Sequence, residues 1–216
     1  MEPIVSDNQS VETLVFNESD YNTCPSGTDS PFDVLLRRKW TEASAKDNVF
    51  RYKVTENSLP AKRLSGRYGM IAQLNEGRAV NRRPPQTMRA IRQPFNGQAF
   101  NFTRINSQEI LFKVESSDGR TSGTVIVNQS PIEYCNALLV PSLDSCRPQV
   151  LTTDALELAI SLVALSGRQS LRVGFNSLGA MASVNHQHFH VYYYDHPMLL
   201  ESLPVRDNRL TGWPIE

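Results

Sequence analysis

The spacing of apolar and polar positions divides the chain into a polar start, an irregular middle and an ordered second half. Residues 1–30 are rich in Ser, Asn, Asp, Glu and Thr and have no regular apolar spacing. Such a segment cannot bury enough apolar surface to offset the entropy lost on ordering, so it is predicted to be a disordered tail. From Pro31 the sequence FDVLLRRKW places apolar side chains near helical spacing, which predicts a short helix.

The middle of the chain has no clear period. Residues 59–106 contain four prolines and several glycines, a composition that breaks both helices and strands. We expect a long irregular segment there, held to the rest of the molecule by Phe95, Phe100 and Phe102.

The second half reads as strands around one helix. The predicted strands are EILFKV (109–114), TVIVN (124–128), NALLVP (136–141), LRVGFN (171–176) and VNHQHFHVYYY (184–194). Asp118 and Gly119 form a turn signal between the first two, so these two strands are predicted to form a hairpin.

The predicted helix is TDALELAISLVALSG, residues 153–167. Asp154 stands three residues before Glu157 as in a capping box, and Gly167 lies where a C-cap belongs. Three strands, one helix and two more strands predict an α+β fold with a mostly antiparallel sheet. We assign this domain to residues 31–216.

Charge is distributed unevenly along a chain of zero net charge. Residues 1–33 hold seven acidic side chains and no Lys or Arg, so the remainder carries 22 minus 15, or +7. Residues 75–107 contribute +5 of this, from Arg78, Arg82, Arg83, Arg89, Arg92 and Arg104 against Glu76. The concentration suits an anionic ligand, although a solvated basic loop is the ordinary alternative.

The chemistry concentrates in NHQHFHVYYY, residues 185–194, which holds three of the four histidines. In a strand His186, His188 and His190 would share one face, about 7 Å apart from twice the rise per residue. Alternate histidines can ligate zinc or iron, but three ligands from one strand converge poorly on one ion. Histidines that only pack or face solvent are the third alternative.

Covalent catalysis explains the run better. A neutral imidazole can attack phosphorus when a backbone carbonyl holds its other nitrogen as a donor. The preceding sequence FNSLGAMASV supplies Asn176, Gly179 and Ser183. Their amide, close backbone approach and hydroxyl could hold phosphate oxygens.

The sequence NSLGAMASVNHQHFHV resembles the histidine triad superfamily. Collinear blocks from about Pro31 onward resemble the GDP-hexose phosphorylases more closely, namely RYGMIAQLNEGRAVNRRPPQ, QPFNGQAFNFTRI, EILFKV, SPIEYCNALLVP and GFNSLGAMASVNHQHFH. The resemblance implies a histidine-triad-like fold and transfer of GMP from a GDP-hexose to inorganic phosphate through a guanylyl-histidine. GDP-D-glucose is the expected sugar nucleotide and GDP-L-galactose the alternative.

The resemblance also assigns roles to single residues. His188 would be the nucleophile, and His186 would orient it through its carbonyl. His190, Asn176 and Ser183 would contact phosphate oxygens, and no cofactor or metal would be needed. The chain departs from the superfamily pattern at Cys135 and Asn136, where Gly-His is usual before the LLVP strand.

Relatives of this kind continue past the histidines into a second half, so the chain is expected to lack that half. Two functions therefore stay open beside the phosphorylase: a non-catalytic nucleotide-binding module, and a hydrolase that uses water as acceptor. We expect GDP-hexose and inorganic phosphate as partners, with a homodimer left open. The absence of RRM, KH and zinc-finger signatures argues against nucleic acid.

Location follows from the cysteines and the start of the chain. Three cysteines without a CxxC pair disfavour a disulfide framework and a structural zinc site. The start has neither a basic nor an apolar leader region, and no apolar run is long enough to span a membrane. A cytoplasmic protein without membrane contact is expected.

Overall fold

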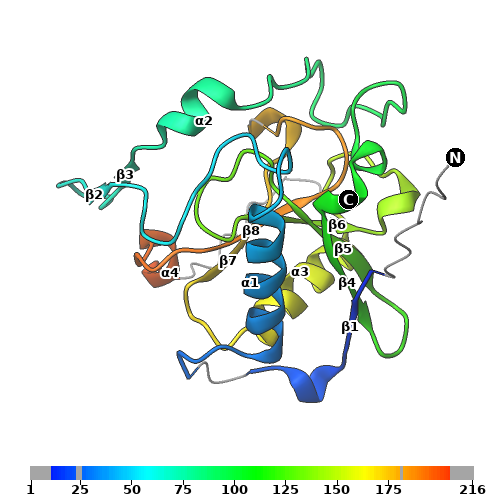
Figure 1. The fold of residues 1–216 in the computed structure, drawn as a ribbon, viewed down its shortest axis with the longest axis horizontal. Helices are drawn as coiled ribbons and strands as arrows, with labels where there is room; N and C mark the ends of the chain where they lie inside the picture. The colour runs from blue at the N-terminus through cyan, green and yellow to red at the C-terminus, as the bar shows by residue number, and fades with distance from the viewer. Residues whose placement is uncertain (1–10, 23–25, 181, 205–216) are drawn as a thin grey trace, which may run out of the picture.

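A six-stranded sheet forms the centre of the computed structural model, which describes residues 11–22, 26–180 and 182–204. The strands lie in the order β1-β4-β5-β6-β8-β7 (Figure 1). Their bounds are β1 Thr13–Phe16, β4 Ile110–Ser116, β5 Ser122–Val127, β6 Ala137–Pro141, β7 Leu171–Gly174 and β8 Phe189–Tyr193. Within this sheet the β1–β4 pair is parallel and the other pairs are antiparallel. The predicted α+β fold with a mostly antiparallel sheet is confirmed.

The helices are α1 (Pro31–Ser44), α2 (Glu76–Asn81), α3 (Thr153–Leu165) and α4 (Leu199–Ser202). The helix predicted from Pro31 is confirmed as α1, which is longer than expected. The predicted hairpin is β4 and β5, and Gly119 in its turn has a φ of 70°. No helix among these residues is long and apolar enough to cross a membrane.

The sheet buries both of its faces. Alternate positions of the central strands pack with α1 and α3 in the main core, namely Val125, Val127, Ala137, Leu139, Phe189 and Val191. The intervening positions pack with Phe102 and Val184 in a second cluster, namely Ile126, Leu138 and Val140. Because strand side chains alternate between faces, His190, which pairs with Leu138 across β6 and β8, lies on the second face. This face carries the histidines.

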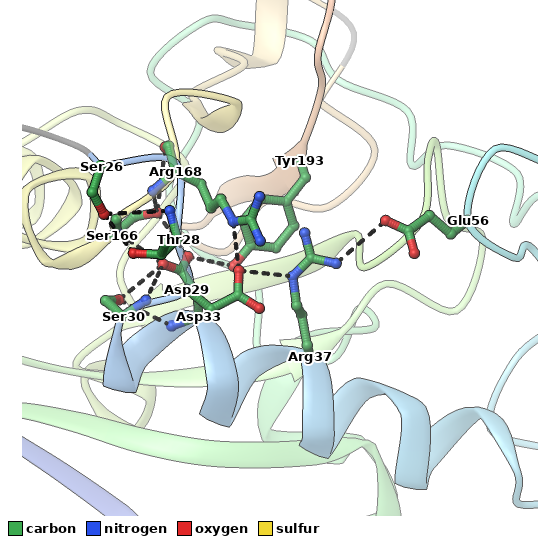
Figure 2. A network of polar contacts seen from close by, with 11 residues as sticks. Ser26, Thr28, Asp29, Ser30, Asp33, Arg37, Glu56, Ser166, Arg168 and Tyr193 are labelled. Atoms are coloured by element: carbon green, nitrogen blue, oxygen red, sulfur yellow. Dashed lines mark hydrogen bonds and ion pairs between the residues drawn. The ribbon is translucent and has the colours of Figure 1, made fainter.

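A buried carboxylate joins the helical layer to the strand that holds His190. Asp33, in the first turn of α1, accepts hydrogen bonds from the Tyr193 hydroxyl at 2.6 Å and the Ser166 hydroxyl at 2.7 Å (Figure 2). It also accepts from the Gly167 backbone N–H at 2.8 Å and from Ser30, the N-cap of α1. The carboxylate thus connects α1, the end of α3 and β8 (Figure 2).

The N-terminal prediction was wrong in part. Residues 1–10 lie outside the described residues, but β1 falls inside the segment predicted to be a disordered tail and pairs in parallel with β4. Phe16 is 3% exposed and belongs to the main core. The strand is too short to show a periodic pattern of its own. Its stability comes from pairing with β4, which lies far away in the sequence.

Two smaller expectations also need correction. Residues 59–106 are largely irregular, as predicted, yet they contain α2 and the two-stranded sheet of β2 (Ala61–Arg63) and β3 (Ile71–Gln73), which projects to the left in Figure 1. The predicted capping of α3 is absent: its N-cap is Thr152, without a side-chain hydrogen bond, and its C-cap is Ser166 rather than Gly167. Asp154 instead forms an ion pair with Arg147.

Candidate active site

The three histidines do not share one strand. β8 begins at Phe189, so His190 lies in the strand while His186 and His188 lie in the irregular stretch before it. The prediction of a strand over 184–194 was wrong for this stretch. Its backbone is held by contacts from other segments instead of by a continuous ladder, and the His188 and His190 rings are 5.8 Å apart.

The side chains of His188 and His190 line a cleft of about 290 Å³, here called the histidine cleft. Asn176 and Ser183 line it as well. Four of the six predicted site residues therefore come together. The other two, His186 and Gly179, are not among its lining residues: His186 is buried, and Gly179 approaches the Ile91 side chain.

The hydrogen bonds of the two buried histidines define their tautomers. His188 Nδ1 lies 2.6 Å from the carbonyl oxygen of His186. Because a carbonyl can only accept, Nδ1 carries the proton and Nε2 keeps its lone pair. His186 Nδ1 accepts the backbone N–H of Phe102 at 3.1 Å, so His186 carries its proton on Nε2.

Burial keeps all three imidazoles neutral near pH 7. It lowers the pKa of His188 to about 4, although the hydrogen bond to the His186 carbonyl opposes the shift. Burial also lowers the pKa of His186 to about 4, opposed by the Leu143 carbonyl. The pKa of His190 falls to about 3, first through burial and then through His188 and the positive charge of Arg78.

Aromatic side chains fix the ring of His186. Phe102, which is 4% exposed, stacks on this ring with centroids 5.4 Å apart, and Phe95 meets it edge-on at 5.3 Å. Phe102 also contacts the edge of His188 at 5.1 Å. The irregular segment is thus attached at the histidines by two of the aromatic residues expected to anchor it.

Gln149 is the main site residue that the sequence analysis missed. Its side chain is 1% exposed and binds both backbone groups of His188: Oε1 accepts the N–H at 2.8 Å, and Nε2 donates to the carbonyl at 3.0 Å. Nε2 also donates to the carbonyl of Asn176 at 2.9 Å. One amide therefore holds two cleft residues in place.

Of the three predicted phosphate ligands, Asn176 and Ser183 line the histidine cleft and Gly179 does not. Asn176 is exposed, and its Nδ2 donates to the Ala180 carbonyl at 3.1 Å. The Ser183 carbonyl accepts the backbone N–H of Gln86 at 3.1 Å, which brings the arginine-rich segment to the cleft. These contacts leave the expected roles of Asn176, Ser183 and Gly179 toward phosphate as predictions.

Only part of the arginine-rich segment reaches the histidine cleft. Arg78, Arg82 and Arg83 line it, together with Arg51, which lies outside that segment and was not predicted. Arg104 donates instead to backbone carbonyls of its own loop. The sequence does not distinguish the arginines that line the cleft from those that do not. The positions of α2 and of the loop after it decide which of them reach the cleft.

The unusual residues before β6 have structural contacts. Asn136 is fully buried, and its Oδ1 accepts from the Ile132 N–H at 2.9 Å and from Asn128 Nδ2 at 2.8 Å. Its Nδ2 donates to the Val191 carbonyl at 3.1 Å. Cys135 is buried with a φ of 59°. Asn136 thus ties the loop after β5, which borders the cleft, to β8.

A metal site requires several ligating side chains close together. Within residues 11–22, 26–180 and 182–204, no group of three or more His, Cys, Asp or Glu side chains is placed to hold a metal ion.

Residues 31–192 match the family model described as GDPGP1-like, N-terminal domain. The chain is similar to GDP-D-glucose phosphorylase 1 of Danio rerio, with 43% identity over 201 residues, 91% of this chain and 57% of that protein. It is 42% identical to GDP-D-glucose phosphorylase 1 of Homo sapiens over 182 residues, 81% of this chain and 46% of that protein.

The similarity extends to a plant protein. GDP-L-galactose phosphorylase 1 of Arabidopsis thaliana is 37% identical over 187 residues, 80% of this chain and 42% of that protein. The chain spans about half the length of the curated relatives it matches. No solved structure matches it.

Proposed function

The chain belongs to the family of GDPGP1-like N-terminal domains, and we propose that it transfers GMP from GDP-D-glucose to inorganic phosphate, as the nucleotidyltransferase part of a GDP-hexose phosphorylase. The proposal rests on one contact above all: the hydrogen bond between His188 Nδ1 and the His186 carbonyl. It leaves the lone pair on Nε2 of a side chain that lines the histidine cleft.

In the proposed first step, His188 Nε2 attacks the α-phosphorus of GDP-D-glucose. The bond from that phosphorus to the bridging oxygen breaks, and glucose 1-phosphate leaves with the bonding electrons. The ring becomes positively charged as the P–N bond forms. The His186 carbonyl dipole at Nδ1 stabilises that charge where it develops.

In the second step, an oxygen of inorganic phosphate attacks the same phosphorus. The P–N bond breaks, its electrons return to Nε2, and GDP departs. The low pKa of His188 supports both steps. The imidazole needs no deprotonation before attack, and it is a good leaving group once it carries phosphorus.

The test is direct labelling. Purified protein is mixed with GDP-D-glucose labelled at the α-phosphate and quenched in alkaline detergent, because phosphoramidate bonds survive base and break in acid. We expect acid-labile label on the protein, lost in His188→Ala and kept in His196→Ala, a histidine that is exposed and outside the cleft. Label that persists in His188→Ala would reject this nucleophile.

Product analysis separates the alternatives. A phosphorylase gives GDP in the presence of phosphate, while a hydrolase gives GMP whether or not phosphate is added. Binding of GDP without any label on the protein would indicate the non-catalytic module. GDP-D-glucose is favoured over GDP-L-galactose because the Danio rerio and Homo sapiens proteins, at 43% and 42% identity, are named GDP-D-glucose phosphorylase, while the plant protein stands at 37%. Competition between the two substrates tests that choice.

The remaining expectations belong to the same proposal. We place the chain in the histidine triad superfamily and in the cytoplasm, with no membrane or nucleic-acid partner. Cys135 and Cys146 are free thiols, which is compatible with a reducing compartment. A homodimer stays a prediction that the mass measured by sedimentation would check.

A further inference from the structure

Four arginines, Arg51, Arg78, Arg82 and Arg83, line the histidine cleft and are here called the arginine wall. Glu109 is the single acidic side chain among the lining residues that the structure describes. Its Oε1 accepts the backbone N–H of Asn106 at 2.9 Å. Acidic side chains of the lining therefore balance only a small part of the positive charge of the arginine wall.

Two of these arginines are held in place by the protein. The Arg83 guanidinium lies 3.4 Å from the centroid of the Phe100 ring, and its Nη2 donates to Gln129 Oε1 at 3.0 Å. Arg78 donates to the carbonyl of Ser130. A guanidinium has five N–H donors, so neither contact exhausts it. Both side chains are half-buried, and little entropy remains to be lost when they bind a ligand.

Their surroundings indicate an electrostatic demand for an anion. Burial lowers the pKa of Arg83, and the neighbouring positive charge of Arg51 lowers it further. The negative charge of Glu109 acts to raise this pKa, but its effect is smaller. The charge of Arg78 reaches His190, since it contributes to lowering the pKa of that histidine. The arginine wall and the histidines thus face a common space.

The chemistry requires two phosphates to use one position. Each displacement at phosphorus is in line, so the group that leaves departs from the side opposite His188 Nε2, and the group that attacks the intermediate enters from that side. Under the proposed function the first is the phosphate of a sugar phosphate and the second is inorganic phosphate. One dianion site serves both.

We propose that Arg78 and Arg83 form this site, binding the dianionic phosphate that leaves as a sugar phosphate ester and enters as inorganic phosphate. The inference rests on the proposed function and adds a consequence to it: the arginine wall selects phosphate over water as acceptor. Arg51 and Arg82, which are exposed at the rim, add attraction over a longer range.

The experiment isolates the second displacement. The labelled guanylyl-protein is prepared, freed of nucleotide, and mixed with increasing inorganic phosphate, while GDP and GMP are counted separately. We expect Arg83→Gln and Arg78→Gln to raise the phosphate concentration for half-maximal GDP formation by tenfold or more. The share of GMP formed with water should rise at the same time. Arg83→Lys should fall between wild type and Arg83→Gln, because it keeps the charge but loses the planar fork.

Arg104→Gln is the matched control. It removes a guanidinium from the same arginine-rich segment, but one that donates to its own loop and does not line the cleft. Its half-maximal phosphate concentration should equal that of the wild type. An unchanged ratio of GDP to GMP in Arg78→Gln and Arg83→Gln, with label still forming on His188, would overturn the subsite and leave the proposed function standing.

A second measurement works without catalysis. Broadening of the 31P resonance of inorganic phosphate by the unlabelled protein reports binding directly. If no guanylyl-protein forms, broadening that is lost in Arg83→Gln and kept in Arg104→Gln would still support the dianion site. Equal broadening by wild type and Arg83→Gln would reject it.

Discussion

Replacing Gln149 with leucine tests whether the buried amide positions His188, the proposed nucleophile. The side chain makes three hydrogen bonds, two to the backbone of His188 and one to the Asn176 carbonyl, at 2.8 to 3.0 Å. At about 1 kcal/mol net for each bond, and more where a buried group is left without a partner, Gln149→Leu should lower the free energy of unfolding by about 3 to 5 kcal/mol. A domain of ordinary stability remains folded after such a loss.

The effect on chemistry should exceed the effect on folding. Once the backbone of His188 is released, its ring can shift, and a displacement of about 1 Å in a reacting group can cost about 100-fold in rate. We expect the rate of label transfer from GDP-D-glucose to His188 to fall by about that factor. The assay is rapid quench in alkaline detergent, at a temperature where urea titration shows the variant to be folded.

Gln187→Leu provides the comparison. Gln187 is also fully buried and makes two side-chain hydrogen bonds, to the Val150 carbonyl at 2.6 Å and to the Thr152 hydroxyl at 3.0 Å, but none to His188. It should lose about 2 kcal/mol of stability and keep a labelling rate within a few-fold of wild type. Equal slowing in both variants, or none in Gln149→Leu, would refute the positioning role.

Three further predictions concern stability. Burial lowers the pKa of His186 and His188 to about 4 and of His190 to about 3, below the unfolded value near 6.5. The unfolded chain therefore binds more protons below pH 6.5, and stability should fall from that pH downward, by about 2 kcal/mol per histidine at pH 5; identical urea midpoints at pH 7 and pH 5 would contradict this. Asp33→Asn places an amide where the carboxylate accepts five hydrogen bonds. It should lower the free energy of unfolding by about 3 kcal/mol or more. A loss below about 1 kcal/mol in urea titration would show that the carboxylate contributes little to stability. Phe102→Ala should cost about 3 to 5 kcal/mol and also slow labelling of the protein, since the ring packs on His186; normal labelling in a destabilised variant would limit Phe102 to packing.

The contribution of the Asp33 carboxylate to stability should decrease at acidic pH, as is usual for a carboxylate whose pKa is lowered by folding. Burial acts to raise its pKa, but the hydrogen bonds from Tyr193, Ser166, Ser30 and Gly167 outweigh burial and lower it. Its contribution to stability is therefore complete above the unfolded pKa near 3.9 and is lost as the pH falls through the folded value. The histidines respond at higher pH, so acid unfolding should begin with them.

Elements with a local pattern could be predicted from the sequence, and elements that depend on distant partners could not. The alternating runs of β4, β5 and β6 and the helical spacing of α3 carry their own signal. β1 does not, because its stability comes from pairing with a strand about a hundred residues later. The predicted capping of α3 was wrong because the helix begins at Thr153, which places Asp154 inside the first turn, where its carboxylate pairs with Arg147.

The candidate site shows the same division. The histidine spacing and the Asn and Ser before it are visible in the sequence, and the structure brings His188, His190, Asn176 and Ser183 to one cleft. Gln149 has no sequence signal, since a buried glutamine and a solvated one look alike until the chain folds. Its partner His188 lies 39 residues away.

The geometry of Gln149 explains how His188, the proposed nucleophile, can lie outside the sheet and still be held in place. β8 pairs with β6 from Phe189 onward and with β7 up to the Gly174–His190 pair, so no strand accompanies His188. An antiparallel partner would exchange two hydrogen bonds with His188, and the Gln149 amide makes the same two, accepting from its N–H and donating to its carbonyl. A side chain thus takes the place of a neighbouring strand at His188. The Gln149 amide fixes the backbone of His188 from one side, while the residue still lines the histidine cleft.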